Sequence, residues 1–421
     1  MLIIKNARVL NPKTALDEVM DIRIENGCIK ETGKNLTTET GTKVLNAEGL
    51  TAAPGLIDVH VHFREPGFTD KEDIETGARA AAAGGYTTVV MMANTKPAVD
   101  SVETLGTVRK RAEQMPIHVL AAAAVTKGLG GMELTDMEAL KEAGAAGFTD
   151  DGIPIMDEAL LKEAFLKAKR LHAPVSLHEE NPALITDNGI NAGKAAKALG
   201  IGGSPREAEI SLTERDLRIA VETGADVNIQ HISTKEAVAL VREAKKQSSH
   251  IHAEATPHHF SLTEEAVLRY GALAKMNPPL RTNEDRLAVI EGLKDGTIDL
   301  IATDHAPHTK EEKEKPLTLA PSGIIGLETA LALGITELVK KGHLTLLQLI
   351  ARMTMGPAGL YHLSAGSLEP GAAADIVLFD ENETWKVDSF ASKASNSPFK
   401  GRELTGKVKY TICGGKIIYS A

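Results

Sequence analysis

The chain has 421 residues, a formal net charge of −10 and only 3% aromatic residues. Proteins that bind nucleic-acid phosphates are usually basic, and those that bind single strands use aromatic side chains for stacking, so both classes are disfavoured. The 43% hydrophobic and 25% charged residues are typical of a soluble globular protein. The length fits either two domains or one large barrel with an appendage.

The two cysteines, Cys28 and Cys413, lie near opposite ends of the chain and form neither a CxxC pair nor a disulfide framework. This usage predicts a reducing compartment. No apolar run is long enough for a membrane span, and the first residues lack the apolar region of a signal peptide. The sequence therefore predicts a cytoplasmic protein with neither a membrane nor a nucleic-acid partner.

The middle of the chain alternates between short apolar runs and helix-like stretches. The apolar runs are predicted strands, and there are eight of them: 57–63, 87–93, 117–124, 146–151, 174–180, 226–233, 250–259 and 299–308. Helix-like stretches follow at 70–83, 101–114, 157–171, 234–246 and 283–294. Eight such alternations indicate an α/β fold of the (β/α)8 TIM-barrel type. A doubly wound open sheet is the alternative, but no Gly-x-Gly-x-x-Gly fingerprint follows an early strand.

The two ends of the chain differ from the middle, because both show alternating strands separated by turn residues. Neither end is large enough for a stable core of its own. We therefore expect residues 1–52 and 366–421 to pair into one small β-sandwich domain beside a catalytic barrel of residues 53–365.

The stretch Asp58-Val-His-Val-His62 carries the strongest chemical signal. Side chains two residues apart on a strand point to the same face, so His60 and His62 should project together. Paired imidazoles suit a divalent metal, although an isolated His-x-His is a weak signal.

Four other predicted strands also end in residues of metal-ligand type. In a barrel the carboxyl ends of the strands meet at one mouth, where the chemistry takes place. A single histidine there is more often structural, and Asp-Asp-Gly is more often a turn or a helix cap. Their convergence nevertheless predicts a metal site that includes Asp150 or Asp151, His178, His231 and Asp304.

With these residues in place, the chain resembles class I dihydroorotases of the amidohydrolase superfamily. The resemblance runs over essentially the whole chain. The matching segments are PGLIDVHVHFREPG (54–67), MANT (92–95), GFTDDG (147–152), SLHEEN (176–181), IQHIST (229–234), NPPLR (277–281), ATDHAPHT (302–309) and PSGIIGLET (321–329).

The resemblance implies a zinc centre of one or two ions, with two favoured. His60, His62 and Asp304 would hold one ion, His178 and His231 the other, and Asp151 rather than Asp150 would bridge them. Many superfamily members use a carbamylated lysine as the bridge, but the fourth strand here ends in aspartates. A shorter aspartate bridge leaves the occupancy of the second position open.

The resemblance also implies a substrate site and a reaction. The reaction is the reversible cyclisation of N-carbamoyl-L-aspartate to dihydroorotate in pyrimidine biosynthesis, with Asp304 as the catalytic acid and base. The substrate would contact His62, Arg64, Asn94, Asn277, His308, Ser322 and Gly323. A structural role in turns stays open for Asn94 and Asn277. The charged run 310–315 is either a solvated loop or a lid over the site.

Two other functions remain open at this point. A hydantoinase or allantoinase would share the barrel, the metals and the ring-amide chemistry, but its substrate need not carry the carboxylate that Arg64 suits. A poorly active subunit that serves as a scaffold for aspartate carbamoyltransferase is the other, although the intact ligand set argues against it. We expect a small-molecule substrate, a homo-oligomer and possible association with that transcarbamoylase.

Overall fold

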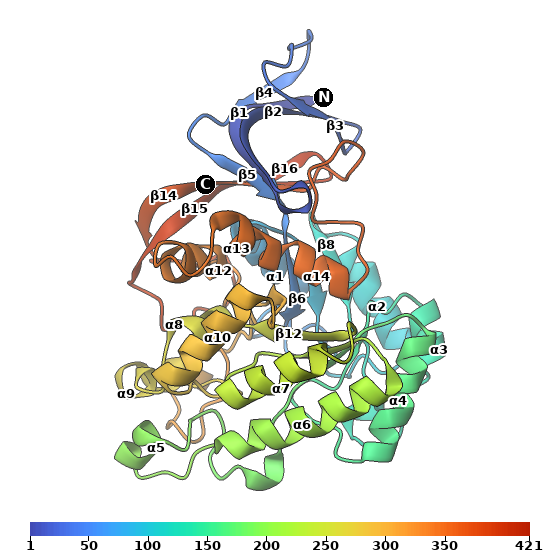
Figure 1. The fold of residues 1–421 in the computed structure, drawn as a ribbon, viewed down its shortest axis with the longest axis vertical. Helices are drawn as coiled ribbons and strands as arrows, with labels where there is room; N and C mark the ends of the chain where they lie inside the picture. The colour runs from blue at the N-terminus through green and yellow to red at the C-terminus, as the bar shows by residue number, and fades with distance from the viewer.

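The computed structural model describes all 421 residues, and its centre is built from short parallel strands (Figure 1). A five-stranded sheet has the order β13-β12-β11-β10-β9, and a three-stranded sheet has the order β6-β7-β8. All eight predicted strands are present: β6 (Leu56–Val61), β7 (Tyr86–Met91), β8 (His118–Ala121), β9 (Phe148–Thr149), β10 (Val175–Leu177), β11 (Val227–Ile229), β12 (Ile251–Ala255) and β13 (Leu300–Ile301).

Isolated parallel bridges connect the two parallel sheets at both of their edges. Val61 at the end of β6 is bridged to His305, which follows β13. Ala123, just after β8, is bridged to Phe148 of β9. These strands are short and almost entirely buried, because helices cover the sheets from outside. Apolar strands of this kind are typical of parallel sheets with covered faces.

The five predicted helices form where the sequence placed them, and local capping explains where they begin. The side chains of Asp73, Ser101, Asp157, Thr234 and Thr282 each accept a hydrogen bond from a backbone N–H in the first turn. Such caps satisfy donors that have no partner within the helix. The helices are α1 (Ile74–Ala83), α2 (Val102–Ala112), α4 (Glu158–Arg170), α7 (Lys235–Lys245) and α10 (Asn283–Asp295).

The longest helix, α6 (Arg206–Thr223), was not among the predicted elements. Its buried face carries Glu209 and Asp216, so an apolar repeat is weak in the sequence. The remaining helices are short: α3 (Met137–Glu142), α5 (Lys194–Leu199), α8 (Pro257–Ser261), α9 (Ala266–Tyr270), α11 (Lys310–Lys313), α12 (Ala330–Leu333), α13 (Leu346–Met353) and α14 (Met355–Leu360). No helix is long and apolar enough to cross a membrane.

Both ends of the chain contribute to one mixed sheet, seen at the top of Figure 1. Its order is β16-β15-β14-β5-β1-β2-β3, and β4 pairs with β1. A separate apolar core of 14 buried residues lies within this region. The strands are β1 (Leu2–Asn11), β2 (Leu16–Glu25), β3 (Cys28–Gly33), β4 (Lys43–Asn46), β5 (Thr51–Pro54), β14 (Ile376–Lys386), β15 (Glu403–Cys413) and β16 (Lys416–Ser420).

The strand β5 joins the terminal sheet to the parallel strands. It pairs with β14 in antiparallel fashion and with β1 in parallel. Gly55 follows directly and leads into β6, and its position is tight because an added Cβ would lie 2.2 Å from the Thr87 hydroxyl oxygen. The terminal sheet therefore fixes the start of the strand that carries His60 and leads directly to His62.

Candidate metal centre

The ends of the parallel strands bring the predicted ligands together. Because parallel strands present their carboxyl ends at the same edge, residues at or after those ends lie close in space. The six residues come from the ends of five strands and are all buried: His60 and His62 from β6, Asp151 after β9, His178 after β10, His231 after β11 and Asp304 after β13.

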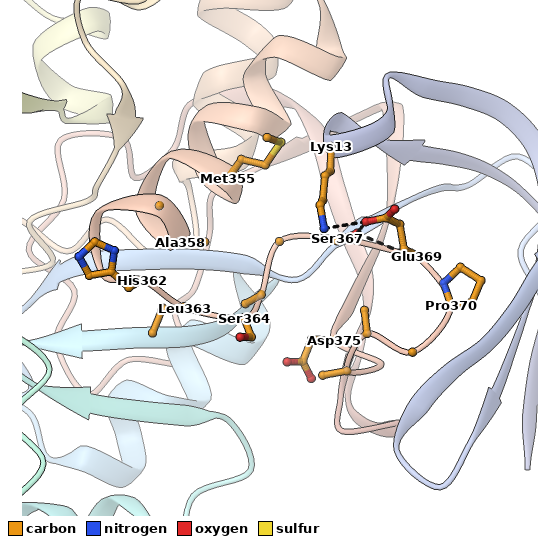
Figure 2. Close-up of a pocket in the computed structure, with 16 residues that line it drawn as sticks. Lys13, Met355, Ala358, His362, Leu363, Ser364, Ser367, Glu369, Pro370 and Asp375 are labelled. Atoms are coloured by element: carbon orange, nitrogen blue, oxygen red, sulfur yellow. Dashed lines mark hydrogen bonds and ion pairs between the residues drawn. The ribbon is translucent and has the colours of Figure 1, made fainter. Parts of the chain in front are cut away.

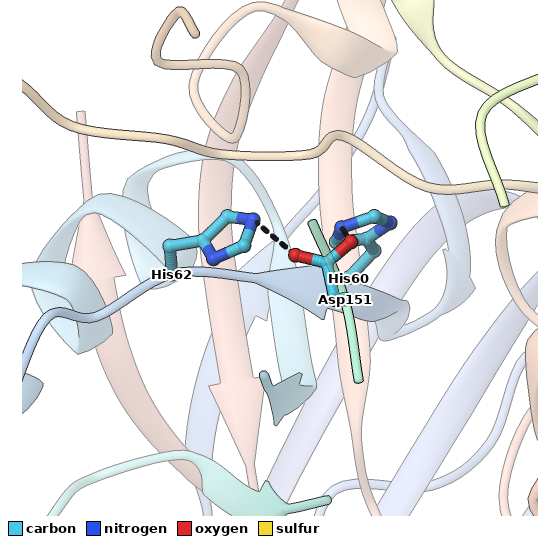
Figure 3. Close-up of side chains that lie close together, drawn as sticks. All are labelled: His60, His62 and Asp151. Atoms are coloured by element: carbon cyan, nitrogen blue, oxygen red, sulfur yellow. Dashed lines mark ion pairs between the residues drawn. The ribbon is translucent and has the colours of Figure 1, made fainter. Parts of the chain in front are cut away.

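A first group consists of His60, His62 and Asp151, whose donor atoms lie within 4.8 Å of one another (Figure 3). The Nε2 atoms of His60 and His62 lie 3.4 and 3.5 Å from the two carboxylate oxygens of Asp151. Asp304 extends this group, because its Oδ1 lies 3.0 Å from His62 Nε2 and 3.5 Å from His60 Nε2.

A second group consists of Asp151, His178 and His231, again with donor atoms within 4.8 Å of one another. His178 Nδ1 lies 2.9 Å from His231 Nε2 and 3.9 Å from Asp151 Oδ1. Asp151 is thus shared by the two groups, as expected for a residue that bridges two ions.

Asp150, the alternative bridge, is occupied elsewhere. Its Oδ1 accepts hydrogen bonds from the backbone N–H groups of Val125 and Thr126 at 2.8 and 3.1 Å, and the Thr126 hydroxyl donates to its other oxygen. Asp150 therefore holds the turn after β8, and the geometry favours Asp151 as the residue that faces the histidines.

The donor set fits a divalent metal. His60 Nδ1 lies 2.5 Å from the Glu254 carboxylate, an acceptor, so Nδ1 carries the proton and Nε2 presents a lone pair. That Nε2 is buried and has no hydrogen-bond partner. Burial acts to raise the pKa of Asp151, but the surrounding imidazoles in their protonated form, His60 foremost, hold it well below its usual value, so the carboxylate is ionised. A bound metal would take the place of those imidazole protons. An ionised carboxylate beside imidazole lone pairs is a typical ligand set for a divalent ion.

Three residues of the site have a left-handed backbone, namely Arg64, His231 and Asp304, with φ of 61°, 33° and 49°. Residues other than glycine rarely adopt such angles, and they concentrate at functional sites. Each lies just beyond the end of its strand, where this conformation turns the chain sharply. The three positive φ angles thus mark the same mouth as the ligands.

Among the predicted substrate residues, Arg64 and Asn94 lie beside the ligands. Burial lowers the pKa of Arg64, with the carboxylates of Asp304 and Asp151 acting against it. Asn94 bonds two predicted ligands, through Oδ1 to His62 Nδ1 at 2.9 Å and through Nδ2 to Asp151 Oδ2 at 3.0 Å. Asn94 therefore orients these ligands in the structure, in addition to any contact with substrate.

The other predicted substrate residues gather around the segment before α12. Asn277 Oδ1 and Ser322 Oγ are buried and have no hydrogen-bond partner. His308 Nε2 donates to the Ser322 carbonyl at 2.8 Å. The Gly323 N–H donates to the Lys275 carbonyl at 2.8 Å, so this backbone group is already used within the chain. The side chains of Asn277 and Ser322 remain free to bind a ligand.

The comparisons with known proteins agree with this geometry. A family model described as "Dihydro-orotase-like" matches residues 49–237, and an "Amidohydrolase family" model matches residues 327–419. The dihydroorotase of Clostridioides difficile (strain 630) is 56% identical over all of both chains. That of Clostridium acetobutylicum is 53% identical over all of this chain and 99% of its own. The chain belongs to the dihydroorotase family.

Similar solved structures include members with other names. The L-hydantoinase (dihydropyrimidinase) from Arthrobacter aurescens has a TM-score of 0.89 at 26% identity, covering 100% of this chain and 96% of its own. A dihydropyrimidinase from Brevibacillus agri has a TM-score of 0.87 at 24% identity, covering 99% and 95%. The fold is thus shared with hydantoinases, whereas the sequence is much nearer to dihydroorotases.

Sequence reasoning missed the residues that hold the ligands. Glu254 on β12 is fully buried and contacts His60, and Glu180 Oε2 lies 3.3 Å from His178 Nε2. Partners of this kind fix the orientation of metal-bound imidazoles. An acidic residue inside the apolar run of β12 was the available signal, because a buried carboxylate needs a partner.

The charged run 310–315 is not an extended loop. Lys310–Lys313 forms α11, which begins with a capping box at Thr309. Lys313 is buried and donates to the carbonyls of Pro321 and Gly323 at 2.8 and 2.9 Å. Lys275 Nζ donates to three carbonyls of the segment that follows α11. These bonds connect residues 310–320 to the segment that carries Ser322 and Gly323. The movement of residues 310–315 as a lid stays a prediction.

Proposed function

We propose that this chain is a dihydroorotase, a hydrolase acting on a cyclic amide, which interconverts N-carbamoyl-L-aspartate and dihydroorotate in pyrimidine biosynthesis. The observation that carries this proposal is the match over the full length to proteins named dihydroorotase, at 51–56% identity. The buried His and Asp clusters agree with it. A cytoplasmic location and a homo-oligomeric state remain predictions.

For the architecture, we propose a closed (β/α)8 barrel of residues 53–365 and a β-sandwich of residues 1–52 and 366–421. The parallel bridges at Val61 and Ala123 support closure, because they connect the edges of the two parallel sheets. The separate 14-residue core supports a second domain.

For the metal centre, we propose two zinc ions. His60, His62 and Asp304 would hold one, His178 and His231 the other, and Asp151 would contact both. When bound, zinc supplies a Lewis acid for the amide carbonyl and lowers the pKa of water to about 7.

The side chains of the protein would supply binding and proton transfer. Arg64 offers a planar fork of donors, which suits the carboxylate of dihydroorotate. Asn277 and Ser322 add unpaired polar atoms for the same ligand. Asp304 would take a proton from the attacking water and return it to the departing ring nitrogen, acting first as a base and then as an acid. In the reverse direction the same carboxylate would remove the proton from the carbamoyl nitrogen.

The main alternative is a hydantoinase, favoured by the names of the structural matches. The two functions separate by substrate, since dihydroorotate carries a carboxylate for Arg64 whereas hydantoin itself does not. The Arg64→Gln variant should raise KM for dihydroorotate and leave any hydantoin turnover unchanged. Association with an aspartate carbamoyltransferase is a further prediction, and co-elution of the two purified proteins would measure it.

The deciding experiment is ring-opening of dihydroorotate by the purified zinc-loaded chain, with metal content measured on the same sample. Turnover with about two zinc ions per chain would support the full proposal. Turnover with one ion would refute the binuclear centre and keep the activity. Turnover of hydantoin alone would overturn the proposed substrate, and inactivity that a transcarbamoylase relieves would identify a required partner.

A further inference from the structure

A second cluster of metal-ligand residues lies away from the predicted centre. It consists of His118, Asp375 and Cys413, whose donor atoms all lie within 4.8 Å of one another. His118 is the first residue of β8, whereas the predicted catalytic ligands lie at or after the carboxyl ends of their strands. Asp375 precedes β14, and Cys413 ends β15. The cluster thus joins the amino-terminal end of a barrel strand to the terminal sheet.

We propose that His118, Asp375 and Cys413 form a separate structural site for a zinc-class divalent cation. A thiolate, an imidazole and a carboxylate are all established zinc ligands, and the set differs from the catalytic donors in containing sulfur. A fourth ligand would be water, because no other donor completes the group. The site would connect the barrel to the terminal sheet.

The carboxylate is already oriented for this role. Asp375 Oδ2 lies 3.0 Å from His118 Nε2, and its Oδ1 accepts the Gly414 N–H at 2.7 Å. The cysteine is buried and free, and its thiol donates a long hydrogen bond, 3.9 Å, to the Thr87 carbonyl beside the side chains of His118 and Asp375. An ion pair between His118 and Asp375 would account for those two residues, and the thiol adds a third donor of metal-ligand type to the same cluster.

The ligands would have to rearrange modestly, with His118 Nε2 and Asp375 Oδ2, now 3.0 Å apart, moving slightly apart. Donors around a tetrahedral zinc lie about 3.4 to 3.6 Å apart, given the usual bond lengths. The side chain of His118 is 51% exposed, so it can move toward the sulfur without disturbing the core. Asp375 also lines a cavity of about 800 Å³ beneath α14, which gives an ion a route from solvent (Figure 2).

Protons compete with the metal at this cluster. Hydrogen bonds to Asp375 and Cys413 raise the pKa of His118 to about 10, against the effect of burial. Ligation needs a neutral imidazole and a thiolate, so binding releases protons. The test should therefore be made at a mildly alkaline pH, where this competition is weaker.

Cobalt(II) provides a direct test, because thiolate ligation gives a charge-transfer band in the near ultraviolet that imidazole and carboxylate ligands do not give. The predicted catalytic ligands contain no sulfur, so the band reports only this cluster. The whole protein loaded with cobalt should show it, and Cys28→Ser should keep it. Cys413→Ser should abolish the band and retain ring-opening activity. A wild-type protein without the band, or a band that survives in Cys413→Ser, would overturn the proposal.

Because Cys413 is buried, its replacement could lose the band by misfolding, and a second variant at a more exposed ligand avoids this problem. His118→Gln changes a half-exposed residue and should weaken the cobalt affinity read from the band. Loss of a supporting contact alone already weakens metal sites about tenfold or more, so removal of a ligand should exceed about 100-fold. Unchanged affinity in this variant would exclude His118 as a ligand and refute the three-residue site.

Discussion

The replacement Glu254→Gln tests how the protein holds its metal centre. Glu254 is fully buried, and its Oε1 contacts His60 Nδ1 at 2.5 Å and accepts the His231 N–H at 3.2 Å. Its Oε2 accepts from Asn228 Nδ2 at 3.0 Å. One carboxylate thus contacts a residue of each metal group, although it is not a predicted ligand.

Glutamine keeps the shape but removes the charge that strengthens His60 as a ligand. Loss of such a partner typically costs 10–100-fold in metal affinity, or about 1.4 to 2.7 kcal/mol. The fold should tolerate the change, because Asn228 can rotate its unpaired Oδ1 toward the new amide. Alanine would instead leave the His231 N–H and the His60 Nδ1–H unpaired, at about 1–3 kcal/mol each.

The assay compares metal affinity, by competition with a chelator, with the free energy of unfolding of the metal-free protein in urea. Glu254→Gln should lose metal affinity and activity together, with stability changed by less than about 1 kcal/mol. Glu254→Ala should lose both affinity and about 2 to 6 kcal/mol of stability. A Glu254→Gln protein that binds metal and turns over like the wild type would refute the role given to this carboxylate.

Three further changes test other parts of the site. Asp151→Asn should lower turnover by more than about 100-fold, whereas Asp150→Asn should retain most of it; equal losses would contradict the assignment. Burial and nearby cations lower the pKa of His308 to about 3, so the unfolded chain gains protons first as pH falls below 6.5. This residue should therefore cost the wild-type protein about 1.4 kcal/mol of unfolding free energy per pH unit between about pH 6 and about pH 4, measured in urea. His308→Gln should abolish that loss, whereas His172→Gln, at an exposed site, should leave it unchanged. Lys275→Met removes the donor to three carbonyls, so hydrogen exchange after α11 should accelerate and KM should rise more than kcat falls.

The fold could be predicted because its local signals are strong. Eight apolar runs alternate with capped helices, and each run became a parallel strand. The helix α6 was not predicted, because Glu209 and Asp216 occupy its buried face and weaken the apolar repeat. Glu209 accepts hydrogen bonds from the backbone and side chain of Ser233, which follows His231. The apolar pattern fails there because the helix supports the site with polar contacts.

The candidate ligands could be predicted because they lie at strand ends, where the fold itself dictates convergence. Their supporting residues could not, because contacts such as that of Glu254 with His60 depend on side-chain orientation between the parallel sheets. The choice between Asp150 and Asp151 could not be made from the sequence either, since adjacent residues at a turn can face different sides. Only the structure shows that Asp150 binds the turn at Val125 and Thr126.

The two carboxylates Asp151 and Glu254 give the centre a shared framework. Asp151 contacts His60 and His178 from the side where metal would bind, and Glu254 contacts His60 and the His231 backbone from behind. A displacement of either carboxylate would therefore move residues of both candidate ligand groups. Because an aspartate bridge is short, the two groups must already lie close together, and the His60 and His231 rings are 5.3 Å apart. By contacting both His60 and the His231 backbone, the buried Glu254 carboxylate holds the two groups close enough for the short Asp151 side chain to bridge them.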